Sequence, residues 1–511
     1  MVGFGLLVAA PKSRTLLGYA LHEGYFWVFH PLAARMLRLF IAFLAVWLSC
    51  CTRTSAQVAP VELGGIISLF GTTASVEVDF RPLQQPGARL ALMALPQQGL
   101  HGMQLRPAAS GDDSLRFTIN SLPGRYVAKL RTTDSLRLTG FLLVAGQRLA
   151  LTLRPIGPDR RAPLRPQTPP TPLPYRELAT QFAGGAPGVR LAATLTVPPG
   201  SGVVPGVVLV SGSGPHNRDG EQFAHQPFRV LADALTRRGF AVLRYDERGV
   251  GRSTGNFAAA STADFAADAT AAVAALRAER RVKIGPVYVL GHSQGSLEVE
   301  RVAAQDPTVA GLVLLGGIGQ PMLTVYKERL RAQVAPRLVA PDTTGRAAIL
   351  STRRVYEAVL DLIAASPDSA TAVAALQRPL VAQGISAEAM SYFAPTYLEH
   401  TMQDILRQDP RPYLQKIKVP VLAVTGGRDE EAPARTQLPA LAAALHSGGN
   451  RALTAVTIPH VTHFFQTIPP TTALSPYDNP ETFSPAVLTI IGDWLTRQVE
   501  QKRVPATSRK K

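Results

Sequence analysis

The sequence predicts a doubly wound, mostly parallel α/β sheet that follows a small β-rich domain. Short apolar runs, among them 207–210 and 241–245, alternate with helical stretches such as 228–238 and 265–280. Strands that alternate with helices form parallel sheets, and a strand buried on both faces reads as a continuous apolar run. Functional residues in such sheets lie in the loops after the carboxyl ends of the strands. Further apolar runs continue the pattern at 287–290, 312–315, 419–424 and 453–458.

The composition excludes several classes of protein. The 511 residues are 46% hydrophobic, so the chain can form two or three domains with sizeable cores. Its two cysteines are too few for a disulfide-stapled scaffold or a cysteine-rich metal site. The net charge of +17 taken alone favours a polyanionic partner. However, 13 of the 17 charges lie in residues 1–56, 154–176 and 502–511, so we expect no nucleic-acid partner.

Residues 1–56 have the layout of an upstream extension followed by a secretory signal peptide. Two arginines precede an apolar run at 39–48, and a small-residue cleavage site ends at Ala56. The run is too short to cross a bilayer, so we expect an exported protein, periplasmic or extracellular, without a stable membrane span. A lipoprotein modified at Cys50 and an uncleaved anchor are the alternatives. Met36 as the true start of the chain is a further hypothesis.

Three more segments complete the predicted domain organisation. Residues 57–153 alternate between apolar and polar positions and carry turn residues, which predicts antiparallel strands of an accessory domain. A substrate- or surface-binding module is the alternative role. Residues 154–174 contain eight prolines and several arginines without interleaved aromatic side chains, which predicts an extended, solvated linker. The α/β domain then occupies 175–501, and a basic tail occupies 502–511.

The string GHSQG at 291–295 is the strongest chemical signal in the sequence. It follows the apolar run that ends at Leu290 and precedes a helical stretch. Glycines at both ends allow a sharp strand-to-helix turn that lifts Ser293 Oγ above the sheet. We therefore predict that Ser293 is a nucleophile, with a structural turn serine as the alternative. A serine hydroxyl needs a neighbouring base to take its proton.

We predict that His463 is this base. It follows the apolar run 453–458, in a loop at the carboxyl end of a strand, and two phenylalanines come directly after it. His460 in the same loop is the alternative, whereas His446 lies within a helical run and is interpreted as a surface residue.

We predict that Asp429 is the acid that orients the base, since it follows the run 419–424 and a pair of glycines. Glu430 and Glu431 are the alternatives. Three adjacent carboxylates repel one another, so we expect two of them to face solvent.

Two backbone amides are expected to form an oxyanion hole. One belongs to Gln294, the residue after the nucleophile. The other is expected at Ser213, in the glycine-rich exit of the run 207–210, with Gly214 as the alternative. The glycines at 249–251 lack the spacing of a dinucleotide loop, and the histidines lack the spacing of a zinc centre, so we expect no cofactor and no metal.

Four strings in this order resemble those of the α/β-hydrolase superfamily. They are SGSGP at 211–215 with Arg218-Asp219, YDERGVGRS at 245–253, GHSQG at 291–295 and HFF at 463–465. More narrowly, residues 175–500, and more loosely 58–153, resemble secreted bacterial serine esterases that begin with a β-rich domain. The resemblance implies hydrolysis of small acyl esters without a metal or cofactor. It also implies that Ser293, Asp429 and His463 form a catalytic triad.

The sequence departs from this family in ways that bear on substrate preference. Ser296 stands where a further glycine is common, and the segment 430–433 replaces the Gln-Val-Pro that often follows the acid. A helical insertion at about 318–415 falls where the fold places a cap over the site. The expected partner is a small-molecule ester. The alternatives are a peptidase or aminopeptidase that acts on amides and a cell-surface binding protein on the same scaffold.

Overall fold

The computed structural model describes the greater part of the chain. It covers the strands between 61 and 155 without their connections, then 165–335, 343–376 without 369 and 373, and 400–503 without 471 and 473. The predicted signal peptide, both cysteines and the tail beyond Arg503 lie outside these residues. Within them, no helix combines the length and the apolar character needed to cross a membrane.

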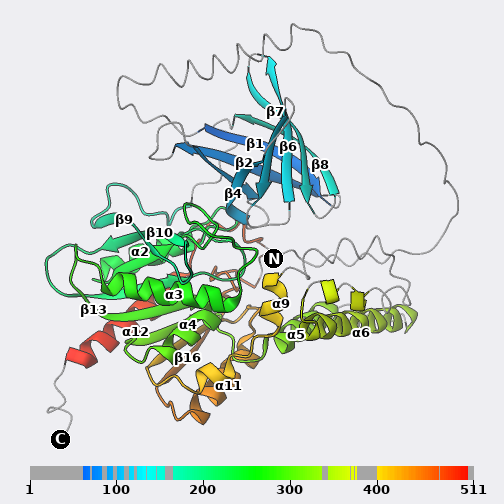
Figure 1. Cartoon of the computed structure of the whole chain (residues 1–511). Coiled ribbons are helices and arrows are strands. Elements are labelled where there is room, and N and C mark those ends of the chain that lie inside the picture. Colours follow the sequence, from blue (N-terminus) through cyan, green and yellow to red (C-terminus); the bar gives the residue numbers. More distant parts are fainter. Residues whose placement is uncertain are drawn as a thin grey trace, which may run out of the picture.

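The first eight strands form an antiparallel sheet that closes on itself (Figure 1). They are β1 (Val61–Leu69), β2 (Thr72–Pro82), β3 (Arg89–Leu95), β4 (Leu100–Ala108), β5 (Ser114–Ile119), β6 (Gly124–Thr133), β7 (Ser135–Val144) and β8 (Gln147–Pro155). Closure comes from β8, which pairs back with β1. Alternate side chains such as Val76 and Val78, or Leu151 and Leu153, are buried, as expected for strands with one face turned to a core. The prediction of a β-rich N-terminal domain is confirmed.

A second sheet of eight strands forms the larger domain. Its strands are β9 (Arg176–Ala183), β10 (Arg190–Val197), β11 (Val204–Val210), β12 (Ala241–Tyr245), β13 (Ile284–His292), β14 (Gly311–Leu315), β15 (Val421–Gly426) and β16 (Leu453–Ile458). Their order across the sheet is β16-β15-β14-β13-β11-β12-β10-β9. Only β10 pairs antiparallel, with β9 and β12, and the remaining pairs are parallel. The predicted mostly parallel, doubly wound sheet is therefore confirmed.

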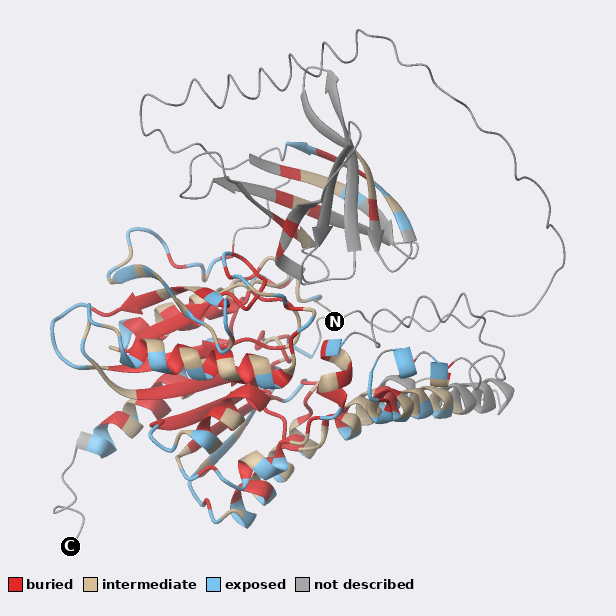
Figure 2. Cartoon of the chain, viewed as in Figure 1, coloured by how far each residue is buried: buried red, intermediate tan, exposed pale blue. Residues whose placement is uncertain are grey.

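Helices cover both faces of this sheet, and the strand sequences show why. The helices are α2 (Pro227–Arg237), α3 (Thr262–Arg277), α4 (Gly295–Gln305), α11 (Ala434–Ser447) and α12 (Pro485–Arg503). In β11, Val207 and Leu209 pack with α2 and α12, whereas Val208 and Val210 pack with α3, α4 and α11. Successive side chains point to opposite faces, so a strand covered on both sides must be apolar throughout. Figure 2 shows the resulting buried strands between the helices.

Further helices are inserted between β14 and β15. They include α5 (Met322–Val334), α6 (Thr343–Ala365), α9 (His400–Leu406) and α10 (Arg411–Leu414). The insertion has a small core of its own, with Leu360, Ile363 and Leu406 at its centre. Val325 of α5 also packs with Leu297 of α4, so the insertion rests on the helix that follows the predicted nucleophile. The closed sheet meets the larger domain where Met103 of β4 forms an isolated bridge with Val250.

The second part of the proline-rich segment is not a solvated linker, contrary to the expectation from its composition. Arg165 is only 7% exposed. Its guanidinium donates to the carbonyl oxygens of Phe223, Ala224, Tyr477 and Asn479. A guanidinium presents five N–H donors in a fixed planar fork, which suits a site where several carbonyls converge. Arg165 therefore ties two loops of the α/β domain to each other.

A buried ion pair near the edge of the sheet carries our first prediction. Asp268 of α3 is 0% exposed, accepts from Arg248 Nε at 2.7 Å and accepts from the Gly185 amide at 2.7 Å. Asp268→Ala leaves a buried guanidinium short of one partner and is expected to cost about 3–5 kcal/mol. Urea unfolding monitored by Trp494, the only tryptophan after residue 57, reports on this domain. Asp493→Ala removes an exposed partner of Arg238 and is expected to cost less than about 0.5 kcal/mol; equal losses would contradict the argument.

Candidate active site

The nucleophile loop is a tight turn that only glycine permits at its two ends. Ser293 has φ of 55°, a left-handed conformation that non-glycine residues adopt at a cost and that is concentrated at functional sites. A Cβ on Gly291 would come within 2.3 Å of the Gly295 carbonyl oxygen, and a Cβ on Gly295 within 2.2 Å of the Ser211 carbonyl oxygen. The GHSQG spacing is thus required by close approach of β13, α4 and the end of β11.

Ser293, His463 and Asp429 form one hydrogen-bonded chain. Ser293 Oγ lies 2.9 Å from His463 Nε2, and His463 Nδ1 lies 2.9 Å from Asp429 Oδ2. Each of the three residues is only 4% exposed. They come from the loops after β13, β16 and β15, which the parallel sheet brings to one edge. With Nδ1–H donated to Asp429, the lone pair of Nε2 is free to accept the Ser293 proton.

Charges around the imidazole favour its protonated form. Burial disfavours a charged His463 ring, but the carboxylates of Asp429 and Glu431 outweigh burial and hold the pKa of His463 above its usual value. For Asp429, burial favours the neutral carboxyl, yet His463 and the Ala432 and Glu431 amides hold the pKa of Asp429 below its usual value. Both directions describe a carboxylate that stabilises an imidazolium beside it.

The alternative histidines are not members of the hydrogen-bonded chain. His460 and His446 are exposed. His292, inside the GHSQG string, bonds the His463 carbonyl oxygen through Nε2 at 3.0 Å. Burial, reinforced by the nearby His463, lowers the pKa of His292 to about 3, so its ring is neutral and fixes the backbone of the His463 loop.

The segment with the predicted oxyanion donor runs beside the nucleophile. A Cβ on Gly212 would lie 3.2 Å from Ser293 Cβ. In the part of the chain that the structure describes, neither the Ser213 amide nor the Gln294 amide donates a hydrogen bond to the protein. The Ser213 carbonyl oxygen lies 2.9 Å from His216 Nε2.

Sequence reasoning missed the residue that supports this loop. Glu247 is buried, and its Oε2 accepts from the His216 amide at 2.7 Å. The Glu247 amide donates in return to the His216 carbonyl oxygen at 3.2 Å. Burial raises the pKa of Glu247 well above its usual value, which the bond from His216 offsets only in part. The string YDERGVGRS does not indicate this role for Glu247, because the partner, His216, lies in a different loop.

The three adjacent acids are arranged differently from the expectation that two would face solvent. Glu430 is exposed, as expected. Glu431 is instead folded back, with Oε2 at 3.5 Å from His463 Nε2 and its side chain 22% exposed. The Glu431 and Ala432 amides donate to Asp429 Oδ1 at 2.9 and 2.7 Å, which fixes the loop.

Among the described residues, no group of three or more His, Cys, Asp or Glu side chains is arranged to hold a metal ion.

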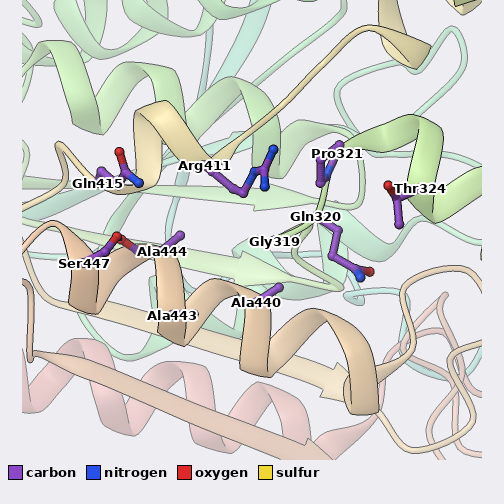
Figure 3. A pocket seen from close by; sticks show the side chains of 10 residues that line it. All are labelled: Gly319, Gln320, Pro321, Thr324, Arg411, Gln415, Ala440, Ala443, Ala444 and Ser447. Atoms are coloured by element: carbon purple, nitrogen blue, oxygen red, sulfur yellow. The ribbon is translucent and has the colours of Figure 1, made fainter.

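A surface hollow lies away from the hydrogen-bonded chain, between the start of α5, α10 and α11 (Figure 3). Its lining contains none of the residues that surround Ser293. The lining residues are Gly319, Gln320, Pro321, Thr324, Arg411, Gln415, Ala440, Ala443, Ala444 and Ser447.

Comparison with known proteins gives one family match and several similar enzymes. The family model described as "Serine aminopeptidase, S33" matches residues 207–465, just over half of the chain. Esterase EstD of Thermotoga maritima is 26% identical over 247 residues, which are 48% of this chain and 52% of that protein. The chain thus matches about half the length of this curated relative.

Two solved esterases are similar in structure. Est1E from Butyrivibrio proteoclasticus with bound ferulic acid is 16% identical, with a TM-score of 0.39 over 63% of this chain and 100% of its own. The Pyrococcus furiosus esterase Pf2001 is 14% identical, with a TM-score of 0.40 over 66% of this chain and 98% of its own.

The family match covers the sheet from β11 to the loop after β16, including all three members of the hydrogen-bonded chain. Together with the strand order, it confirms the α/β-hydrolase fold that the sequence motifs resembled. The chain therefore belongs to the serine aminopeptidase S33 family.

Proposed function

We propose that the chain is a serine hydrolase that cleaves small carboxylic esters through an acyl-enzyme intermediate. The observation that carries this proposal is the unbroken chain of hydrogen bonds from Asp429 through His463 to Ser293 Oγ. Similarity to a protein named as an esterase supports the ester as substrate. We also propose that the enzyme is exported, which N-terminal sequencing of the mature protein would test.

In the proposed reaction, Ser293 Oγ attacks the ester carbonyl carbon while His463 Nε2 takes the hydroxyl proton. The carbonyl π-bond opens to an oxyanion, which the Ser213 and Gln294 amides hold by hydrogen bonds. The oxyanion then re-forms the carbonyl and expels the alcohol, which leaves with the proton from His463. A water molecule repeats the sequence on the acyl-enzyme, with His463 again as base, and releases the acid and the free serine.

Substrate panels and active-site labelling test this proposal. We expect the purified protein to hydrolyse p-nitrophenyl acetate or butyrate and to be labelled by a fluorophosphonate at one site. Peptide mapping is expected to place the label on Ser293. Labelling at another residue, or ester turnover that persists after complete labelling of Ser293, would refute the assignment.

Cleavage of amide bonds is the second candidate, and the description of the family favours it. The same nucleophile, base and oxyanion donors serve either reaction, since both proceed through a tetrahedral intermediate. Aminoacyl-nitroanilides assayed beside the corresponding nitrophenyl esters would separate the two. We expect the ester to have the larger kcat/KM.

A further inference from the structure

The His463 ring has a carboxylate at each of its nitrogens. Asp429 Oδ2 accepts from Nδ1, the role expected of the orienting acid. Glu431 Oε2 lies 3.5 Å from Nε2, the nitrogen that also contacts Ser293 Oγ at 2.9 Å. The second contact has no part in the reaction proposed above, and a negative charge beside Nε2 must influence any proton that Nε2 carries.

Glu431 is held in this position by two different elements. Its amide donates to Asp429 Oδ1 at 2.9 Å, so the orienting acid also anchors the backbone of the second carboxylate. From the inserted helix α5, Arg329 Nε donates to the Glu431 carbonyl oxygen at 2.5 Å. Glu431 Oε2 is shielded from solvent and accepts no hydrogen bond from a described residue. The loop thus places the charge at Nε2 rather than in water.

We propose that Glu431 is a positioning residue of the active site, which acts on the reaction through His463 and sets the pH range in which the enzyme hydrolyses esters. This inference rests on the proposed function. It adds a member to the site that neither the family match nor the hydrogen-bonded chain itself requires.

The side chains that face His463 come from the loop after β15, from α5 and from the end of β13. Asp429 and Glu431 in the loop after β15 favour the imidazolium, and Arg329 of α5 opposes it. His292 at the end of β13 is neutral, with its ring centroid 5.0 Å from that of His463 and the two rings tilted by 40°. Ser293 carries no charge. Burial is the strongest single effect and opposes the imidazolium. The pKa of His463 is nevertheless raised, because the two carboxylates together outweigh burial.

The sign of the effect follows from the role of the base. His463 can take a proton from Ser293 only when its ring is neutral, so activity rises as the pH passes upward through the pKa of His463. Removing the negative charge of Glu431 destabilises the imidazolium and lowers that pKa. The acid limb of the kcat/KM profile of Glu431→Gln is therefore expected to move to lower pH, by about one unit for a charge at this distance.

The test compares Glu431→Gln with Glu430→Gln, a matched change of the same charge at the neighbouring, exposed residue. kcat/KM for p-nitrophenyl acetate is measured between about pH 5 and pH 9, together with the rate of fluorophosphonate labelling. We expect the acid limb to shift for Glu431→Gln in both measurements and to stay in place for Glu430→Gln. Glu431→Asp, which retains the charge, is expected to stay closer to the native profile than Glu431→Gln.

Coincident acid limbs for the native protein and Glu431→Gln would overturn the inference, as would equal shifts for both Gln variants. Trp494 fluorescence at the high-pH plateau verifies that each variant is folded. Failure of the proposed function looks different, because Ser293→Ala would then hydrolyse the ester as fast as the native chain. In that case the His463 resonances, assigned by their loss in His463→Ala, are titrated by NMR and still show whether Glu431→Gln lowers the pKa of the ring.

Discussion

Ser293→Ala is expected to lower kcat for p-nitrophenyl acetate by about 10⁵-fold, because the attacking oxygen is removed while the surrounding site remains. Alanine keeps a Cβ at this position, so the left-handed turn is expected to persist, and the flanking glycines keep their close contacts with each other and with the end of β11. We expect thermal unfolding to change little. Residual turnover would come from the oxyanion donors and from binding alone.

Ser447→Ala is the matched control for this variant. Ser447 lies at the end of α11 in the hollow of Figure 3, with its hydroxyl bonded to the Ala444 carbonyl oxygen. It is expected to leave kcat and KM unchanged. If Ser447→Ala lost activity and Ser293→Ala retained it, the site of catalysis would have to be moved to that hollow.

Asp429→Asn is expected to lower kcat by about 10³- to 10⁴-fold, for a reason that the local hydrogen bonds define. Asp429 Oδ1 accepts from the Glu431 and Ala432 amides, so the oxygen of an asparagine side chain must face those donors. The NH₂ group then faces His463 Nδ1 and donates to it. This forces the ring proton onto Nε2, which can no longer take a proton from Ser293.

Rates at saturating ester, measured for Asp429→Asn beside Glu430→Gln, test this argument. Glu430 lies one residue away and is exposed, so its neutralisation is expected to change kcat by less than about twofold. An Asp429→Asn variant within about tenfold of the native rate would show that the ring is oriented by another group. Glu431 would then be the first residue to examine, since it also contacts the ring.

The sequence singles out three residues as chemistry-bearing because each follows a short apolar run that forms a strand of the sheet. Ser293, Asp429 and His463 lie in the loops that follow β13, β15 and β16, and parallel strands bring such loops to one edge. The predicted runs 241–245 and 453–458 coincide with β12 and β16. These inferences depend on local sequence patterns, which can be recognised without knowledge of any long-range contact.

Features that depend on distant partners were not predictable in this way. The antiparallel strands β9 and β10 were not expected. The edge strand β9, which pairs only with β10, is half exposed and lacks the apolar run of a central strand. Arg165 falls in the predicted linker. Its burial could not be predicted, because its partners Tyr477 and Asn479 lie more than 300 residues further along the chain. Glu431 was expected to face solvent as readily as Glu430, because only the fold of the loop distinguishes the two.

The buried position of Arg165 also decides where the two folded parts of the chain can be separated. A fragment that began at residue 175, the predicted start of the α/β domain, would lack both Arg165 and Gln167. Gln167 accepts from the Thr482 and Phe483 amides, and Arg165 bonds the Phe223 and Tyr477 carbonyl oxygens. Cutting the chain at residue 175 therefore removes hydrogen bonds that hold loops of the α/β domain together. The separable unit therefore starts upstream of Arg165, within the first half of the proline-rich segment.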